Sequence, residues 1–115
     1  MILDIKNKIE ESYYWDARVK KINCNYFGDE VELVFEDGDK DIIYHFQECY
    51  EVNIKHLPDY VKEIPSKDLK REQIPYFMQD VEVKEIEIDN KQFLEFVINM
   101  HPIQVLIKCL KFEIE

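Results

Sequence analysis

Two runs of alternating apolar residues on either side of a tight turn restrict the fold of this chain more than any other feature. Every second residue is apolar from Val31 to Phe35 and again from Ile42 to Phe46, and Asp37-Gly38 lies between the runs. An apolar residue at every second position lines one face of an extended strand. Asp-Gly between two such runs is one of the strongest short-range signals for a β-hairpin. The sequence therefore predicts two antiparallel strands joined by a tight turn.

Further strands are predicted on both sides of this hairpin. Residues 19–26 alternate into a turn at Gly28-Asp29, which predicts a preceding strand. Residues 49–54 keep the same period after a slip in register beyond Phe46, so they can continue the sheet. Three antiparallel strands in meander order are expected in the amino-terminal half.

The carboxy-terminal third also has strand patterns. Between residues 81 and 88 the apolar positions change parity, and a bulge near Lys84-Glu85 would let all of them face inward. Residues 93–100 are apolar at nearly every position, which predicts a central strand buried on both faces. His101-Pro102 ends that strand, and residues 105–114 are expected to form the last one.

Two segments do not fit the period of two. Residues 3–13 place their apolar side chains on one helical stripe, which predicts a short helix or turn. Residues 56–78 contain three of the four prolines and clustered charges, so they predict an excursion over the surface. The expected fold is mainly β: an antiparallel sheet or sandwich of six to seven strands, with a short N-terminal helix and a long irregular connection in the middle.

Length and composition favour one compact domain that spans residues 1–115. A chain of 115 residues and 14.0 kDa lies below the size at which a second domain is expected. With 46% hydrophobic residues it can fill a core, and only 2 glycines exclude a collagen-like or Gly-rich chain. No apolar run approaches the roughly 18 residues that a membrane helix needs, so no membrane partner is expected.

Charge narrows the classes of partner. Asp and Glu total 25 against 15 Lys and Arg, which gives a formal net charge of −10 and an isoelectric point near 4.7. Nucleic-acid-binding surfaces are basic, so nucleic acid is not an expected partner. Two interpretations remain: a surface that only resists aggregation, or one that attracts a basic protein and speeds its association. An odd number of cysteines and the lack of a secretory signal favour a cytoplasmic location.

The sequence contains no motif that announces catalysis or a cofactor. His45 and Cys49 have the spacing of a helical metal site, but on an extended strand they lie about 13 Å apart, too far for one ion. Cys24 and Cys109 lie in apolar strand patterns, where a thiol is structural rather than nucleophilic. Glycine-rich phosphate-binding motifs are missing. We therefore expect no enzyme activity, no metal and no cofactor.

Acidic residues are concentrated in the first hairpin and again between residues 80 and 89. The simpler interpretation of these acidic residues is a solvated face that discourages edge-to-edge aggregation. The functional interpretation is a docking face for a basic protein, with aromatic side chains as anchors. On that interpretation, the residues predicted to bind the partner are Asp29, Glu30, Glu32, Glu36, Asp37, Asp39, Trp15, Tyr76 and Phe77.

Two segments resemble a known class of small proteins. Tyr14 to Val19 (YWDARV), followed by alternating strands with acidic turns and then by His45 to Tyr50 (HFQECY), is similar to small β-rich bacterial proteins. These include the immunity proteins of polymorphic and contact-dependent toxin systems. The resemblance covers the amino-terminal half. It implies an acidic cytoplasmic protein that binds a cognate toxin, often a basic nuclease, and blocks it by covering its active site.

Two other functions are compatible with these residues. A small-molecule-binding domain or enzyme of unknown reaction would have its pocket near residues 56–78. Its first candidate residues are His56, His101, Tyr76 and Cys49. A self-associating subunit would instead pair residues 105–114 with a second copy of the chain. The favoured function is a non-enzymatic binding domain that neutralises a toxin.

Overall fold

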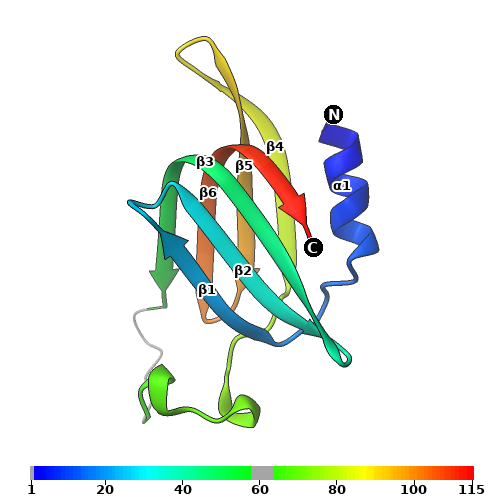
Figure 1. Ribbon diagram of the computed structural model, residues 1–115, viewed down its shortest axis with the longest axis vertical. Coiled ribbons are helices and arrows are strands. Elements are labelled where there is room, and N and C mark those ends of the chain that lie inside the picture. Colours follow the sequence, from blue (N-terminus) through cyan, green and yellow to red (C-terminus); the bar gives the residue numbers. More distant parts are fainter. Residues whose placement is uncertain (1, 58–63) are drawn as a thin grey trace.

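The fold is a six-stranded antiparallel sheet with one short helix against it (Figure 1). The computed structural model describes residues 2–57 and 64–115. Its elements are α1 (Ile2–Glu11), β1 (Val19–Asn25), β2 (Glu30–Asp37), β3 (Lys40–His56), β4 (Asp80–Ile88), β5 (Lys91–Met100) and β6 (Ile103–Ile114), with 3₁₀ turns at Ser66–Asp68 and Arg71–Gln73. The prediction of a mainly-β fold with a short N-terminal helix is confirmed, and the strands form one sheet.

The sheet is built from two three-stranded meanders. Its strand order is β1-β2-β3-β6-β5-β4, so β3 and β6 join the two halves and β1 and β4 are its edges. The sheet is strongly curved, and α1 lies on its open side beside β4 (Figure 1). The concave face therefore holds the core, and the helix covers part of it.

The two edges of the sheet approach each other at one end. Arg18, just before β1, forms an isolated antiparallel bridge with Phe77, just before β4. The amide of Val19 also donates to the carbonyl oxygen of Tyr76 at 2.9 Å. These contacts connect the start of β1 to the segment that leads into β4, and this end of the curved sheet is nearly closed.

Aromatic side chains fill the concave face. Phe35, Tyr44, Phe46 and Phe96 are fully buried. Phe46 and Phe96 meet edge to face with ring centroids 5.0 Å apart, an arrangement that adds stability to the burial of the rings. Tyr44 and Ser12 share a hydrogen bond of 2.7 Å, which fastens the end of α1 to the sheet. Burial raises the pKa of Tyr44 to about 12.

A register shift inside β3 confirms the slip that the sequence predicts there. The pairing of β3 with β6 shifts between Cys49 and Glu51, and Glu48 has a positive φ of 52°. Cys49 lies opposite Cys109 on β6. The neighbouring thiol of Cys49 and burial both raise the pKa of Cys109. The irregularity lets the strand change its facing without leaving the sheet.

The predicted bulge near Lys84-Glu85 is wrong. The pairing of β4 with β5 is continuous from Asp80 to Ile88, with no shift in register. Ile86 lies opposite Phe93, whose ring packs against Tyr50 at 5.4 Å between centroids. Apolar neighbours thus exist on both faces of this hairpin, and Ile86 does not need a bulge to find them.

Two predictions about the last strands are also wrong. β5 lies next to the edge strand β4 and is buried mainly on one face, because Asn99 is exposed and Glu95 is only half-buried. β6 lies inside the sheet between β3 and β5. Residues 103–109 are paired on both edges, and residues 110–114 are paired with β3 on one edge, so residues 105–114 are not the free edge strand that self-association would need.

The two segments outside the period of two agree with their predictions where the structure describes them. The helical stripe of residues 3–13 corresponds to α1. The connection between β3 and β4 contains only the two 3₁₀ turns in its described part, and residues 58–63 of the predicted excursion lie outside the described residues. None of the described helices is long and apolar enough to cross a membrane.

Candidate functional site

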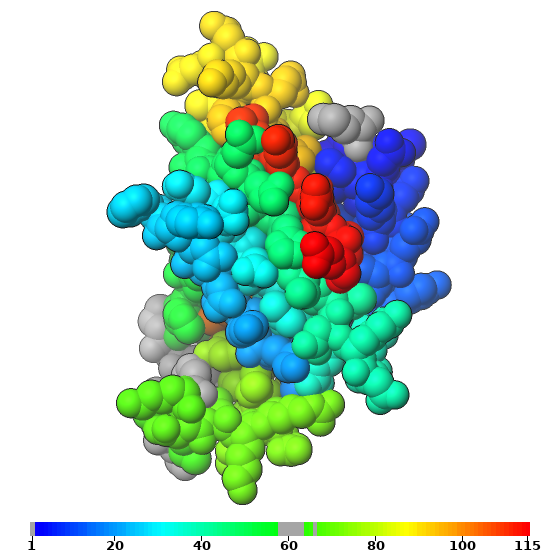
Figure 2. Space-filling view, in the orientation of Figure 1, coloured from blue at the N-terminus to red at the C-terminus, as the bar shows by residue number. Residues whose placement is uncertain are grey.

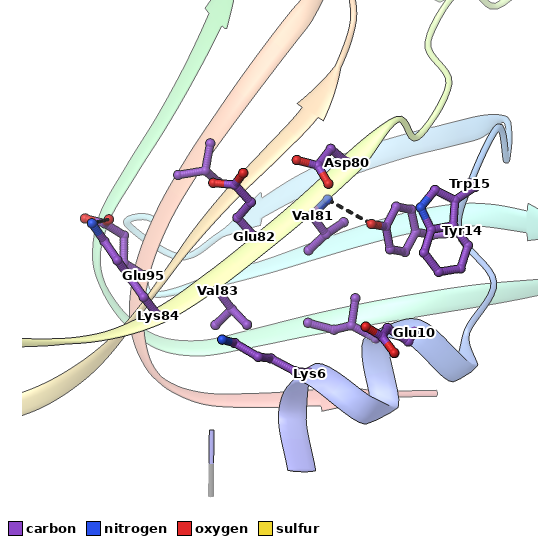
Figure 3. Close-up of a pocket in the computed structure, with 12 residues that line it drawn as sticks. Lys6, Glu10, Tyr14, Trp15, Asp80, Val81, Glu82, Val83, Lys84 and Glu95 are labelled. Carbon is purple, nitrogen blue, oxygen red and sulfur yellow. Dashed lines mark hydrogen bonds and ion pairs between the residues drawn. The ribbon is translucent and has the colours of Figure 1, made fainter. Parts of the chain in front are cut away.

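A groove of about 610 Å³ runs between α1 and β4 (Figure 3). We call it the α1–β4 groove. One wall comes from the helix and the turn after it, and the other comes from the edge strand. The residues that line it are Lys6, Ile9, Glu10, Tyr14, Trp15, Asp80, Val81, Glu82, Val83, Lys84, Glu95 and Val97.

The helix wall is held in place by a buried residue and a hydrogen bond. Ile9 is the one buried residue of α1 and packs into the core, so Lys6 and Glu10 remain exposed at the groove. Tyr14 is buried, and its hydroxyl accepts a hydrogen bond of 3.2 Å from the amide of Val81 (Figure 3). This bond ties the turn after α1 to β4.

Trp15 is the exposed aromatic residue of the groove. Its ring stacks on Tyr14 with centroids 4.4 Å apart and an interplanar angle of 27°. Half of the residue is nevertheless exposed. A large aromatic ring that is fixed by stacking but still open to solvent can anchor a partner with little loss of side-chain entropy.

The strand wall alternates between apolar and acidic side chains. Val81 and Val83 pack against the core, whereas Asp80 and Glu82 are exposed. Lys84 is paired with Glu95 across the hairpin at 3.3 Å. Asp80 and Glu82 have no ion-pair partner within residues 2–57 and 64–115.

The surroundings of the groove are acidic as a whole. Residues 2–16 and 80–91 contain nine carboxylates and four lysines, which accounts for half of the formal net charge of −10. Burial raises the pKa of Tyr14, and the charges of Asp80 and Glu10 raise it further. The groove is therefore a concave acidic surface with an aromatic residue at its rim.

The acids predicted from the first hairpin lie elsewhere, along β2 and its two turns. Asp29 and Glu30 are at the start of β2, and Asp37 and Asp39 are at its far end. The length of the strand separates these two pairs by roughly 23 Å. They do not form one compact cluster.

Two of the predicted acids interact strongly with neighbouring residues. The carboxylate of Glu36 accepts hydrogen bonds from Arg71 at 2.6 and 2.8 Å and lies 3.8 Å from Arg18. The hydrogen bonds to Glu36 and the negative charge of Glu36 raise the pKa of Arg71. Glu32 accepts a hydrogen bond of 3.1 Å from Asn25 and lies 3.9 Å from His45. These contacts hold together β1, β2, β3 and the 3₁₀ turn at Arg71–Gln73.

The three predicted aromatic anchors are also separated. Trp15 lines the α1–β4 groove. Phe77 lies under the guanidinium of Arg18, 5.1 Å from the ring centroid. Tyr76 meets the ring of His56 edge to face at 6.4 Å. Phe77 and Tyr76 are half-buried, so they contribute to packing between the two edges of the sheet.

The residues of the alternative pocket are brought together only in part. His56 and His101 line one hollow of about 540 Å³, and Tyr76 contacts His56 from outside its lining. Cys49 lines a different hollow, beside the turn between β1 and β2. In the part of the chain that the structure describes, no three His, Cys, Asp or Glu side chains are arranged to hold a metal ion.

Sequence reasoning missed two features of the surface. Glu10 and Lys6 were not expected to face a groove, because their neighbour β4 is distant in the sequence. Phe27 is almost completely exposed, at 98%, in the turn between β1 and β2, and Tyr26 beside it is also exposed. This turn projects from the side of the molecule opposite α1 (Figure 2). An aromatic pair beside Gly28 was the available signal.

The comparison with known families covers the whole chain. The family described as "Immunity protein PIM7" matches residues 1–115. No curated protein matches the chain. The match includes both halves of the sheet, α1 and the connection between β3 and β4. The chain belongs to the PIM7 family of immunity proteins.

Proposed function

We propose that this immunity protein is a non-enzymatic inhibitor that binds its cognate toxin through the acidic surface around the α1–β4 groove. The toxin is a basic protein, in the most concrete case a nuclease. The observation that carries the proposal is the concentration of carboxylates without cationic partners beside a concave surface and an exposed Trp15.

Electrostatics supports a basic partner at this surface. A carboxylate that already pairs with an arginine, as Glu36 does with Arg71, exerts a weak field at a distance. Asp80 and Glu82 have no such partner in residues 2–57 and 64–115, so their field extends into solvent. Such a field steers a basic protein toward the groove and speeds association.

Shape and aromatic content support retention of the partner after encounter. The groove lies within the size range of protein binding pockets, and the ring of Trp15 can fill a pocket on the partner. Carboxylates around such an anchor occupy the cationic site that a nuclease uses for its polyanionic substrate. Inhibition then follows from occlusion and requires no chemistry on the immunity protein.

The acids of β2 remain part of the proposal as a second surface. Asp29 and Glu30 lie beside the exposed Phe27 at the turn between β1 and β2, and this group can contact a large toxin. Glu32, Glu36, Asp37, Asp39, Tyr76 and Phe77 stay predicted contacts.

Growth protection and binding test the proposal together. The toxin domain encoded beside this chain is produced with and without it, and the complex is measured at low and high salt. We expect the chain to restore growth, to form a one-to-one complex, and to bind more slowly as salt rises. If the chain fails to restore growth, the inhibitor role is contradicted. If the association rate does not change with salt, binding through the acidic surface is contradicted.

A further inference from the structure

The outer edge of β4 has backbone groups that no other strand pairs. β4 and β5 are joined by the two-residue turn Asp89-Asn90, whose φ values of 49° and 67° are those of a type I′ turn. The residues that flank such a turn, Ile88 and Lys91, form a hydrogen-bonded pair. Even-numbered residues of β4 therefore bond to β5, and odd-numbered residues direct their amide and carbonyl groups away from the sheet.

A hydrogen bond at the other end of β4 agrees with this assignment. The amide of Val81, an odd-numbered residue, donates to the hydroxyl of Tyr14 and not to β5. Val83, Glu85 and Glu87 follow with the same orientation. Within residues 2–57 and 64–115, these three amides donate no hydrogen bond to a backbone carbonyl of a turn, loop or cap. The hairpin rises beyond the end of α1, so this edge is open above the groove (Figure 1).

The opposite edge of the sheet is less suited to pairing. β1 has an irregularity between Val19 and Lys21, and Arg18 before it is bridged to Phe77. Lys20 and Lys21 are both exposed there. Irregular pairing and lysines are common means by which an edge strand avoids further strands. β4, in contrast, is regular along its full length.

We propose that an extended, basic segment of the toxin adds to the sheet as a strand beside β4, bonding to Val83, Glu85 and Glu87. This mode of recognition takes its affinity from main-chain hydrogen bonds and its specificity from side chains. It deepens the proposed function and rests on it, because it assigns the contact within the same acidic surface.

Charge decides which strand fits this edge. The segment from Asp80 to Asp89 carries five carboxylates and one lysine, Lys84, which is paired with Glu95. A second copy of β4 would place like charges opposite one another, which is destabilising. A strand with lysine or arginine opposite Glu85 and Glu87 is complementary. The occupant is therefore a basic partner segment and not another copy of this chain.

A matched pair of variants at one position tests the main-chain contact. Glu85→Pro removes the outward amide while leaving the even-numbered bonds to β5 in place, and Glu85→Gln removes only the charge. Against the toxin domain encoded beside this chain, we expect Glu85→Pro to bind at least about tenfold more weakly than Glu85→Gln. Equal affinity of the two variants, with unchanged circular dichroism, would overturn strand addition.

Amide hydrogen exchange on the unaltered chain tests the same contact without a variant that could misfold. The amides of Val83, Glu85 and Glu87 should exchange fast in the free protein and at least about tenfold more slowly in the complex. Unchanged exchange at all three would overturn the proposal.

The two proposals fail in different ways. If the chain restores growth and binds the toxin but these amides are unaffected, strand addition is wrong and the inhibitor role stands. If the chain neither binds nor protects, both are wrong. A dimer in light scattering that Glu85→Pro disrupts would show that the occupant is a second copy.

Discussion

The carboxylates of β2 and those around the α1–β4 groove have the same charge but different neighbours. Glu36 is only 13% exposed and is held by Arg71 and Arg18, so it connects parts of the fold. Asp80 and Glu82 are exposed and form no ion pair within residues 2–57 and 64–115. An acidic sequence run therefore does not identify a binding surface by itself. What distinguishes Glu36 from Asp80 and Glu82 is whether the charge has an ion-pair partner within the described residues.

The largest expected effect concerns Tyr44, which links β3 to the helix wall of the groove through Ser12. Its pKa is raised to about 12 in the folded protein by burial, above the ordinary value of 10.0. The folded state therefore favours the protonated phenol, and this contribution is complete below pH 10 and is lost as pH rises through 12. We expect the free energy of unfolding to fall by up to roughly 3 kcal/mol over that window.

Chemical denaturation at a series of pH values measures this loss. Tyr44→Phe lacks the phenol that ionises at this position, so its stability should be lower at pH 8 and should fall less than that of the unaltered chain between pH 10 and 12; the raised pKa of Tyr14 accounts for part of the remaining fall. A fall of the same size in the variant would assign the alkaline transition to another group.

The next effect separates the structural acid from the exposed one. Glu36→Ala should lower the free energy of unfolding by about 1–2 kcal/mol, because a half-buried carboxylate loses charge-assisted hydrogen bonds. Glu82→Ala should change it by less than about 0.5 kcal/mol. Urea unfolding of both variants tests this difference, and equal losses would mean that the two regions do not differ in the way described.

Charge reversal applies the same comparison to binding. The double variant Glu10→Lys and Glu82→Lys should slow association with the toxin about tenfold at low salt, and less at high salt. Its matched control is Asp37→Lys and Asp39→Lys, which changes the same charge in the turn between β2 and β3. We expect a smaller effect there. A larger effect of the control in stopped-flow association would move the binding surface to the β2 turn.

The smallest expected effect is at the exposed turn between β1 and β2. Phe27→Ser should leave the free energy of unfolding within about 0.5 kcal/mol, because the side chain is 98% exposed and contributes little packing. Affinity for the toxin is the informative measurement. A tenfold loss would establish this turn as a second contact, and unchanged affinity would leave the α1–β4 groove as the principal one.

The strands could be predicted because their information is local. Alternation around Asp37-Gly38 and the slip beyond Phe46 each determine the facing of nearby residues, and β1, β2 and β3 follow from them. The bulge near Lys84-Glu85 was predicted on the assumption that every apolar residue of a strand faces one core. That assumption fails because Tyr50 and Phe93 form an apolar contact of their own.

The groove could not be predicted because it joins segments distant in the sequence. Trp15 was recognised as a candidate anchor, but its neighbours on β4 depend on strand order, which alternation does not contain. The compensation of Glu36 likewise depends on Arg71 in the irregular connection. Sequence patterns indicate which side chains are exposed, whereas their grouping on the surface requires the topology.

The pairing of β3 with β6 affects the rate of folding. Each meander can form from neighbouring segments, but residues 44–56 must find residues 103–114 before the two halves share a core. Closing such long loops costs entropy before their contacts stabilise the chain, and sheets of this kind fold on the order of milliseconds to seconds. Under the proposed function, the chain would need to be synthesised ahead of the toxin, so that the pairing of β3 with β6 is complete before the two proteins meet.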